Sequence, residues 1–229
     1  QVTLSTERYG RRQTNAFRKL AADGKEYTVV SPTRGVGSVS LDAQGRLYAV
    51  ERTCTEPLNS SLPASNDLTA AVPLLPERKV LAMTLGNGAP LARLNDLIAD
   101  GKGGAYFTVG GAYYVSPAGV VSTVADQDIR SNGIMLSPDG RTLYVTNNTN
   151  VLASDVRADG TTANRRDFGT LDGDDGGDGM AVDSEGRLYV TGNKGVHVLS
   201  TRGEYLGLIP TPRRPITVAF SGPDKNLLY

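Results

Sequence analysis

Apolar and polar positions alternate in short runs along most of the chain, and tight turns rich in Asp and Gly separate the runs. Five segments repeat one pattern, which is an apolar strand, a turn, and a second strand that carries tyrosine. They are 39–50, 97–108, 134–146, 180–191 and 218–229. Asp and Gly supply the backbone geometry of tight turns, and alternation suits a half-buried strand. The pattern therefore predicts a series of antiparallel hairpins.

The spacing of these hairpins predicts the fold class. The aligned tyrosines follow one another at intervals of 58, 38, 45 and 40 residues. A period near 40 is typical of β-propeller blades. Weaker strand pairs fill the intervals, at 15–30, 78–94, 112–125, 151–168 and 195–209. We therefore expect an all-β protein, a β-propeller of four-stranded antiparallel blades that forms one domain over residues 1–229.

Two features depart from a regular repeat. Residues 52–77 are rich in Ser, Pro, Thr and Asn, and they predict an insertion that forms a surface loop. The chain also opens on an outer hairpin and closes on an inner one. Either five blades close through the N-terminal hairpin, or a six-bladed ring lacks a hairpin at each end. The stop at Tyr229 in mid-pattern favours the incomplete six-bladed ring.

Composition narrows the chemistry. The 24 Lys and Arg balance 24 Asp and Glu, so the chain has no electrostatic attraction for phosphate backbones, and we expect no nucleic-acid partner. We expect no membrane partner, because no run approaches the roughly 18 apolar residues of a membrane span. A single His and a single Cys are too few for a tetrahedral zinc site, so any metal must be a hard cation held by oxygens. The composition leaves a periplasmic or secreted location and a cytoplasmic one equally open.

Four stretches carry a resemblance to a known family. They are LNDLIADGKGGAYFT (94–108), SNGIMLSPDGRTLYVTN (131–147), GDGMAVDSEGRLYVTGNKGVHVLSTRGEYLGLIP (177–210) and TVAFSGPDKNLLY (217–229). In this order and spacing the chain resembles the gluconolactonase/regucalcin-like family of senescence marker protein type. The resemblance implies a six-bladed propeller, one divalent metal at its axis, and hydrolysis of a sugar-acid lactone such as gluconolactone. It implies calcium as the ion, with magnesium, manganese and zinc as alternatives. It further implies that the binding partner is a small-molecule lactone. It also implies that the protein is a monomer or a weak dimer.

The resemblance also assigns site residues. The metal ligands correspond to Asn132, Asp178 and Asn95, and the repeat alignment independently gives these three the same place, two residues before a strand. Asp178 is the candidate general base, because it is the only carboxylate that the alignment places at the axis. Asn95 and Arg93 are the candidate substrate contacts. The alternative is that the Asn and Asp residues only cap turns and that Arg93 is an ordinary surface arginine.

One departure from the family leaves other functions open. The family's metal-binding Glu belongs to a Glu-Gly-Pro segment, and this sequence contains no such segment. An organophosphate-type esterase on the same site and a non-catalytic propeller that binds a ligand or a protein are therefore the alternative functions. His197 lies in an alternating strand, where a packed or surface role is a better interpretation than a catalytic one.

Overall fold

The described part of the chain consists entirely of β-strands, turns and irregular segments. The computed structural model describes residues 17–20, 25–30, 36–52, 69–75, 77–92, 94–126, 128–221 and 225–229. Helices are absent from these residues, and so none of them provides a helix that could span a membrane. The prediction of an all-β protein is confirmed.

The strands form antiparallel sheets that follow one another along the chain. A two-stranded sheet holds β1 (Phe17–Leu20) and β2 (Glu26–Val30), and a three-stranded sheet holds β3 (Val36–Leu41), β4 (Leu47–Arg52) and β5 (Thr69–Leu75). The first four-stranded sheet holds β6 (Leu97–Ala99), β7 (Ala105–Thr108), β8 (Ala112–Val115) and β9 (Val121–Ala125). The second holds β10 (Ser131–Leu136), β11 (Thr142–Asn147), β12 (Asn150–Val156) and β13 (Thr162–Thr170). The third holds β14 (Met180–Val182), β15 (Leu188–Thr191), β16 (Gly195–Leu199) and β17 (Tyr205–Pro210), and the last pair is β18 (Phe220–Ser221) with β19 (Leu227–Leu228).

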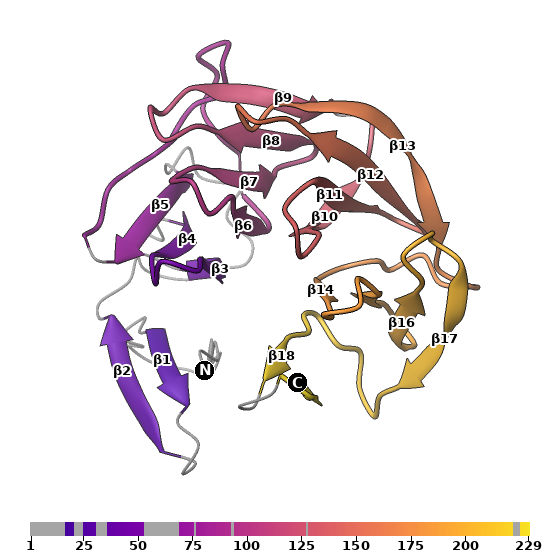
Figure 1. Cartoon of the computed structure of the whole chain (residues 1–229). Coiled ribbons are helices and arrows are strands. Elements are labelled where there is room, and N and C mark those ends of the chain that lie inside the picture. The colour runs from indigo at the N-terminus through magenta and orange to yellow at the C-terminus, as the bar shows by residue number, and fades with distance from the viewer. Residues whose placement is uncertain are drawn as a thin grey trace, which may run out of the picture.

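The sheets are arranged about a common centre, as propeller blades are (Figure 1). The first strand of each larger sheet lies nearest that centre, and later strands lie progressively farther out. All five predicted tyrosine hairpins are present, and four of the five weaker strand pairs form named strands. In the described residues β1–β2 and β18–β19 remain separate two-stranded sheets, so strand pairing does not close the ring. A closed ring of six blades stays a prediction.

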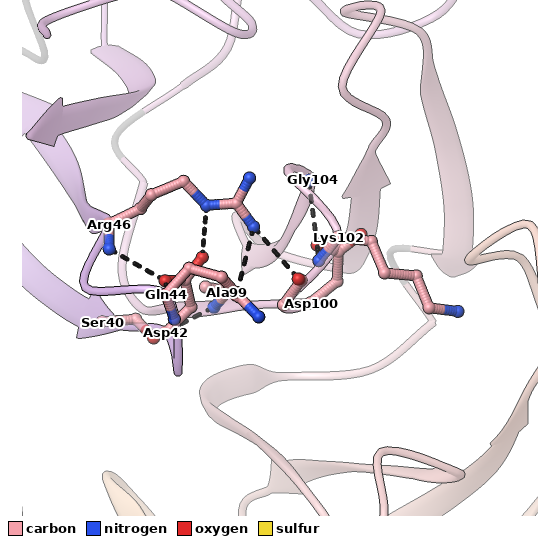
Figure 2. Close-up of polar contacts among 9 residues, drawn as sticks. Ser40, Asp42, Gln44, Arg46, Ala99, Asp100, Lys102 and Gly104 are labelled. Atoms are coloured by element: carbon pink, nitrogen blue, oxygen red, sulfur yellow. Dashed lines mark hydrogen bonds and ion pairs between the residues drawn. The ribbon is translucent and has the colours of Figure 1, made fainter. Parts of the chain in front are cut away.

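The hairpin turns use the chemistry that the sequence predicted. In the turn between β3 and β4, Asp42 Oδ1 accepts hydrogen bonds from two backbone amides and Gly45 has a φ of 77°. Arg46 Nε donates to Asp42 Oδ2 at 2.6 Å, and its Nη2 donates to the Gly101 carbonyl of the next sheet at 3.0 Å (Figure 2). Asp100 repeats the arrangement in that next sheet, accepting from the amide of Gly104. These turns therefore fasten neighbouring sheets to each other as well as joining strands.

The hydrophobic core lies between sheets. Each buried cluster combines residues of two neighbouring sheets. The central strands of the sheets carry near-continuous apolar runs, and successive side chains of such a run point to opposite faces of the sheet. Four of the five repeated tyrosines take part in this packing. Tyr48, Tyr106 and Tyr144 are almost completely buried against the following sheet, Tyr189 is partly buried, and Tyr229 is exposed. The Tyr106 hydroxyl also donates to the Gly160 carbonyl of that sheet at 2.7 Å. Each sheet is consequently stabilised by its neighbours.

The predicted insertion needs a correction. Residues 69–75 fall within the expected loop 52–77, yet they form β5, which pairs with β4. Apolar residues predominate there, and its Pro73 is tolerated because β5 is an edge strand. The segment 78–94, predicted to be the outer strand pair, forms no named strand in its described residues, where Thr84 bridges to Pro90 around a short turn. Residues 53–68, which include the predicted loop residue Cys54, lie outside the described residues.

Candidate functional site

Three of the predicted site residues come together at the centre of the molecule. Asn95 precedes β6, Asn132 lies near the start of β10, and Asp178 precedes β14. Asn95 Nδ2 donates a hydrogen bond to Asn132 Oδ1, and Asn132 in turn interacts with the Asp178 carboxyl and lowers its pKa. These interactions involve side chains from three consecutive sheets. The structure therefore brings these three side chains near one another, and their assignment as a functional site stays a prediction.

Hydrogen bonds within and between sheets hold these residues in position. The Asn95 amide donates to the Thr108 carbonyl at 2.9 Å, and the Thr108 hydroxyl donates to the Asn132 carbonyl at 2.6 Å. The Asp178 amide likewise donates to the Thr191 carbonyl at 2.9 Å. Both threonines are completely buried. Each ends the second strand of its hairpin, so Thr108 connects Asn95 and Asn132, and Thr191 connects Asp178, to the rigid part of a sheet.

The glycines that follow two of the site residues allow the sheets to approach. A side chain on Gly133 would overlap the backbone carbonyl of Asp178. A side chain on Gly179 would lie 2.8 Å from the Cα atom of Thr217, and the Gly179 amide donates to the Ile216 carbonyl at 3.0 Å. Only glycine fits such close backbone contacts. The separation between neighbouring site residues is therefore fixed by direct contact between backbones.

Asp96 places a second carboxylate beside the site. It takes the place that Gly133 and Gly179 occupy in the later sheets, and its Oδ2 accepts from the Ile134 amide of the next sheet at 3.1 Å. Its Oδ1 accepts from the Leu97 amide at 2.9 Å and from the Ser38 hydroxyl. With these bonds Asp96 is held as a fixed negative charge.

Burial and the neighbouring charges shift the pKa of Asp178. Burial raises the pKa of Asp178 to about 6, and the negative charge of Asp96 adds to the rise. Arg214 and the hydrogen bond from Asn132 act in the opposite direction. Desolvation and a like charge both disfavour an ionised carboxyl. Asp178 is therefore half-buried, mostly ionised near pH 7.5, and basic enough to accept a proton.

The chemical character of these side chains suits a hard cation. Amide and carboxylate oxygens are the donors that calcium and magnesium prefer, and Asn95, Asn132 and Asp178 supply both kinds. The electrostatic cost of placing Asp178 near Asp96 is one that a cation would relieve. The described residues contain no group of three or more His, Cys, Asp or Glu side chains placed to hold a metal. An ion here would therefore depend on the two asparagines as neutral ligands.

Sequence reasoning missed several residues that shape this site. Asp96 and the buried threonines 108 and 191 had a visible signal, since Asp96 adjoins Asn95 and the threonines end the repeated Tyr-x-Thr strands. No signal in the sequence pointed to Arg214, because it lies in an irregular segment between sheets. The fourth predicted residue, Arg93, lies outside the described residues.

Comparisons with known proteins agree with this architecture. Lactonase drp35 of Staphylococcus aureus is 34% identical over 138 residues, which cover 53% of this chain and 43% of that protein. The chain thus spans less than half the length of this curated relative. The structure of a gluconolactonase from Xanthomonas campestris has a TM-score of 0.70 and 24% identity, covering 90% of this chain and 72% of that one. The structure of the calcium-binding protein regucalcin from Agrobacterium tumefaciens has a TM-score of 0.68 and 20% identity, covering 94% of this chain and 74% of that one.

The two structural likenesses establish the fold, and the match to the family establishes membership. The family described as the SMP-30/gluconolactonase/LRE-like region matches residues 13–229, which is nearly the whole sequence. That range includes all three site residues that the structure brings together. The chain belongs to the SMP-30/gluconolactonase/LRE-like family.

Proposed function

We propose that this chain carries the active site of a divalent-metal-dependent hydrolase that opens a sugar-acid lactone such as gluconolactone. The observation that carries the proposal is the series Asn95–Asn132–Asp178, in which three consecutive sheets each contribute one oxygen-bearing side chain to the centre and neighbouring members interact. Membership of the family and the lactonase name of the drp35 relative support the reaction class. The proposal includes a six-bladed ring in a single domain, supported by the radial order of the sheets.

Asn95, Asn132 and Asp178 are the residues that would hold the ion, with calcium as the first choice. A divalent cation bound there would polarise the lactone carbonyl and stabilise negative charge on its oxygen. Regucalcin, whose fold this chain shares, is described as a calcium-binding protein, which supports that choice of ion.

Asp178 is the residue that we propose as general base. Its carboxylate would take a proton from the attacking water while the water oxygen bonds to the lactone carbonyl carbon. The bond between that carbon and the ring oxygen then breaks, and the ring oxygen takes the proton that Asp178 accepted, which gives the hydroxy acid and restores the carboxylate. Asp96 is a poorer base, because its two oxygens already accept bonds from the Ile134 and Leu97 amides and the Ser38 hydroxyl. Asn132 would orient the Asp178 carboxylate through their hydrogen bond.

Asn95 and Arg93 are proposed to contact the substrate. Asn95 is exposed and reaches the Asn132 amide, so one side of its side chain faces the site. Arg93 lies two residues earlier in the sequence. We expect them to bind the hydroxyl groups of a sugar-acid lactone.

The test is calorimetric titration of metal-stripped protein with Ca²⁺, Mg²⁺, Mn²⁺ and Zn²⁺, followed by gluconolactone hydrolysis at constant pH. We expect saturable binding at one site and metal-dependent hydrolysis, both lost in Asp178→Ala. Asp139→Ala is the matched control, because Asp139 is an exposed carboxylate in the turn at the other end of β10. Absence of binding by all four ions would overturn the proposal and leave a non-catalytic binding propeller. Binding with hydrolysis of an organophosphate ester but of no lactone would instead favour the esterase.

A further inference from the structure

A buried histidine lies in the outer half of the sheet that carries Asp178. His197, in β16, is completely buried, and its Nε2 lies 3.1 Å from Oδ2 of Asp174, which is also buried. Its Nδ1 lies 3.3 Å from the Tyr205 hydroxyl in β17. A neutral histidine satisfies both contacts when Nε2 carries the hydrogen and donates to the carboxylate, and Nδ1 accepts from tyrosine. The sequence interpretation of His197 as a packed strand residue agrees with its burial, but its polar contacts show a more specific arrangement.

Asp174 joins two segments of backbone. Its Oδ1 accepts from the Gly176 amide at 2.9 Å and from Asn193 Nδ2 at 3.0 Å, and its Oδ2 accepts from the Lys194 amide at 3.0 Å. Burial acts to raise the pKa of Asp174, but the hydrogen bonds from Gly176, His197 and Lys194 outweigh it and hold the pKa below its usual range. The carboxylate therefore ties the segment 172–177 to the turn that follows β15.

Both of the joined segments lead directly to Asp178. On one side, the Gly177 amide donates to the Asn148 carbonyl of the preceding sheet at 3.1 Å. On the other side, Thr191 immediately precedes the turn and accepts from the Asp178 amide at 2.9 Å. The turn is closely packed against Asp174, since a side chain on Gly192 would lie 2.7 Å from the Asp174 carboxylate. A shift of Asp174 would therefore move two segments: the residues that precede Asp178 in the sequence, and the end of β15 to which the Asp178 amide is hydrogen-bonded.

We propose that His197 and Asp174 are positioning residues, which fix the backbone around Asp178 and so set its ability to bind a divalent cation. His197 supplies the donor that keeps the Asp174 carboxylate in place, and Asp174 holds both segments. The consequence for cation binding rests on the function proposed above, whereas the fixing of the backbone does not.

The experiment compares three variants of the full chain. His197→Leu removes the donor to Asp174, whereas His197→Gln keeps an N–H near the position of Nε2. Tyr106→Phe is the matched control, since it removes a buried hydrogen bond, to the Gly160 carbonyl, in a different pair of sheets. Native-state amide exchange is measured at Gly177 and Asp178 and expressed relative to the global unfolding of each variant. Calcium affinity is measured by calorimetry at a temperature where all variants are folded.

We expect exchange at Gly177 and Asp178 to be at least tenfold faster in His197→Leu than in Tyr106→Phe, with His197→Gln near the wild type. We expect calcium to bind His197→Leu at least fivefold more weakly, and the other two variants within twofold of the wild type. Exchange in His197→Leu equal to that in Tyr106→Phe would overturn the inference, because a purely structural histidine predicts that result. Faster exchange with unchanged calcium affinity would also overturn it. A wild type that binds no calcium would refute the proposed function, while the exchange data would still decide whether the pair fixes the backbone.

Discussion

Replacing Asp178 by asparagine is expected to stabilise the metal-free protein. The pKa of the Asp178 carboxyl is about 6 in the folded state and 3.8 in its ordinary state. Between these two values the folded state holds more protons than the unfolded state, so stability falls as pH rises from about 4 to about 6. Above that range the ionised carboxylate destabilises the fold, and a neutral asparagine of the same shape removes this cost.

The magnitude follows from the size of the pKa change. One pKa unit corresponds to about 1.4 kcal/mol, so a change of about two units sets a ceiling of about 3 kcal/mol. Asp178 is only half-buried, and solvent screening reduces the ceiling by about half, to about 1–1.5 kcal/mol. For a chain of this size that gain corresponds to a rise in melting temperature of about 2–6 °C.

The assay is urea unfolding of metal-stripped wild type and Asp178→Asn at pH 7.5 and at pH 4 or below. We expect the variant to be more stable at pH 7.5, and the difference to shrink at pH 4 and to disappear well below it, where the carboxyl is protonated in both the folded and the unfolded state. Asp139→Asn is the control, because a hydrogen bond from Ser137 lowers the pKa of Asp139 and the sign reverses, so this variant should not gain stability at pH 7.5. The reasoning would be refuted if Asp178→Asn were less stable than the wild type at pH 7.5, or if its gain were equal at both pH values.

Three further predictions concern packing and charge. Tyr106→Phe leaves the Gly160 carbonyl without its 2.7 Å donor and should cost about 1–2 kcal/mol, measured by urea unfolding; no loss would show that the bond is replaced. Gly133→Ala forces a side chain against the Asp178 backbone, so we expect lowered stability together with weaker calcium binding, and unchanged affinity would contradict the close contact. Arg214→Gln removes a positive charge that lowers the pKa of Asp178, so the acid limb of lactone hydrolysis should move to higher pH, and a pH profile that does not move would count against that interaction.

Repetition made much of this fold predictable from the sequence. A hairpin that recurs with tyrosine in the same place defines both its strands and the face that it buries, so all five such hairpins are present. The same repetition located Asn95, Asn132 and Asp178, because equivalent positions in radially arranged sheets meet at one centre. Asn132 departs slightly, since β10 begins at Ser131 and its pairing is irregular until Ile134.

What the sequence did not reveal depends on irregular segments and contacts between sheets. Strand β5 follows a long polar stretch, and only its pairing with β4 distinguishes it from a loop. The charge of Arg214 reaches Asp178 because backbone contacts with Gly179 hold the neighbouring segment in place. Local sequence patterns carry no information about such contacts, since both partners lie far apart in the chain.

The placement of the core between sheets has a consequence for how proteins of this kind can gain repeats by duplication. One hairpin unit brings half of a buried interface and, at the start of its first strand, one side chain directed to the centre. Duplication of such a unit would add one buried interface between sheets and, at the same time, one potential metal ligand at the centre. The outer turns bring no side chain to the centre, so they can diverge while the number of central groups follows the number of repeats.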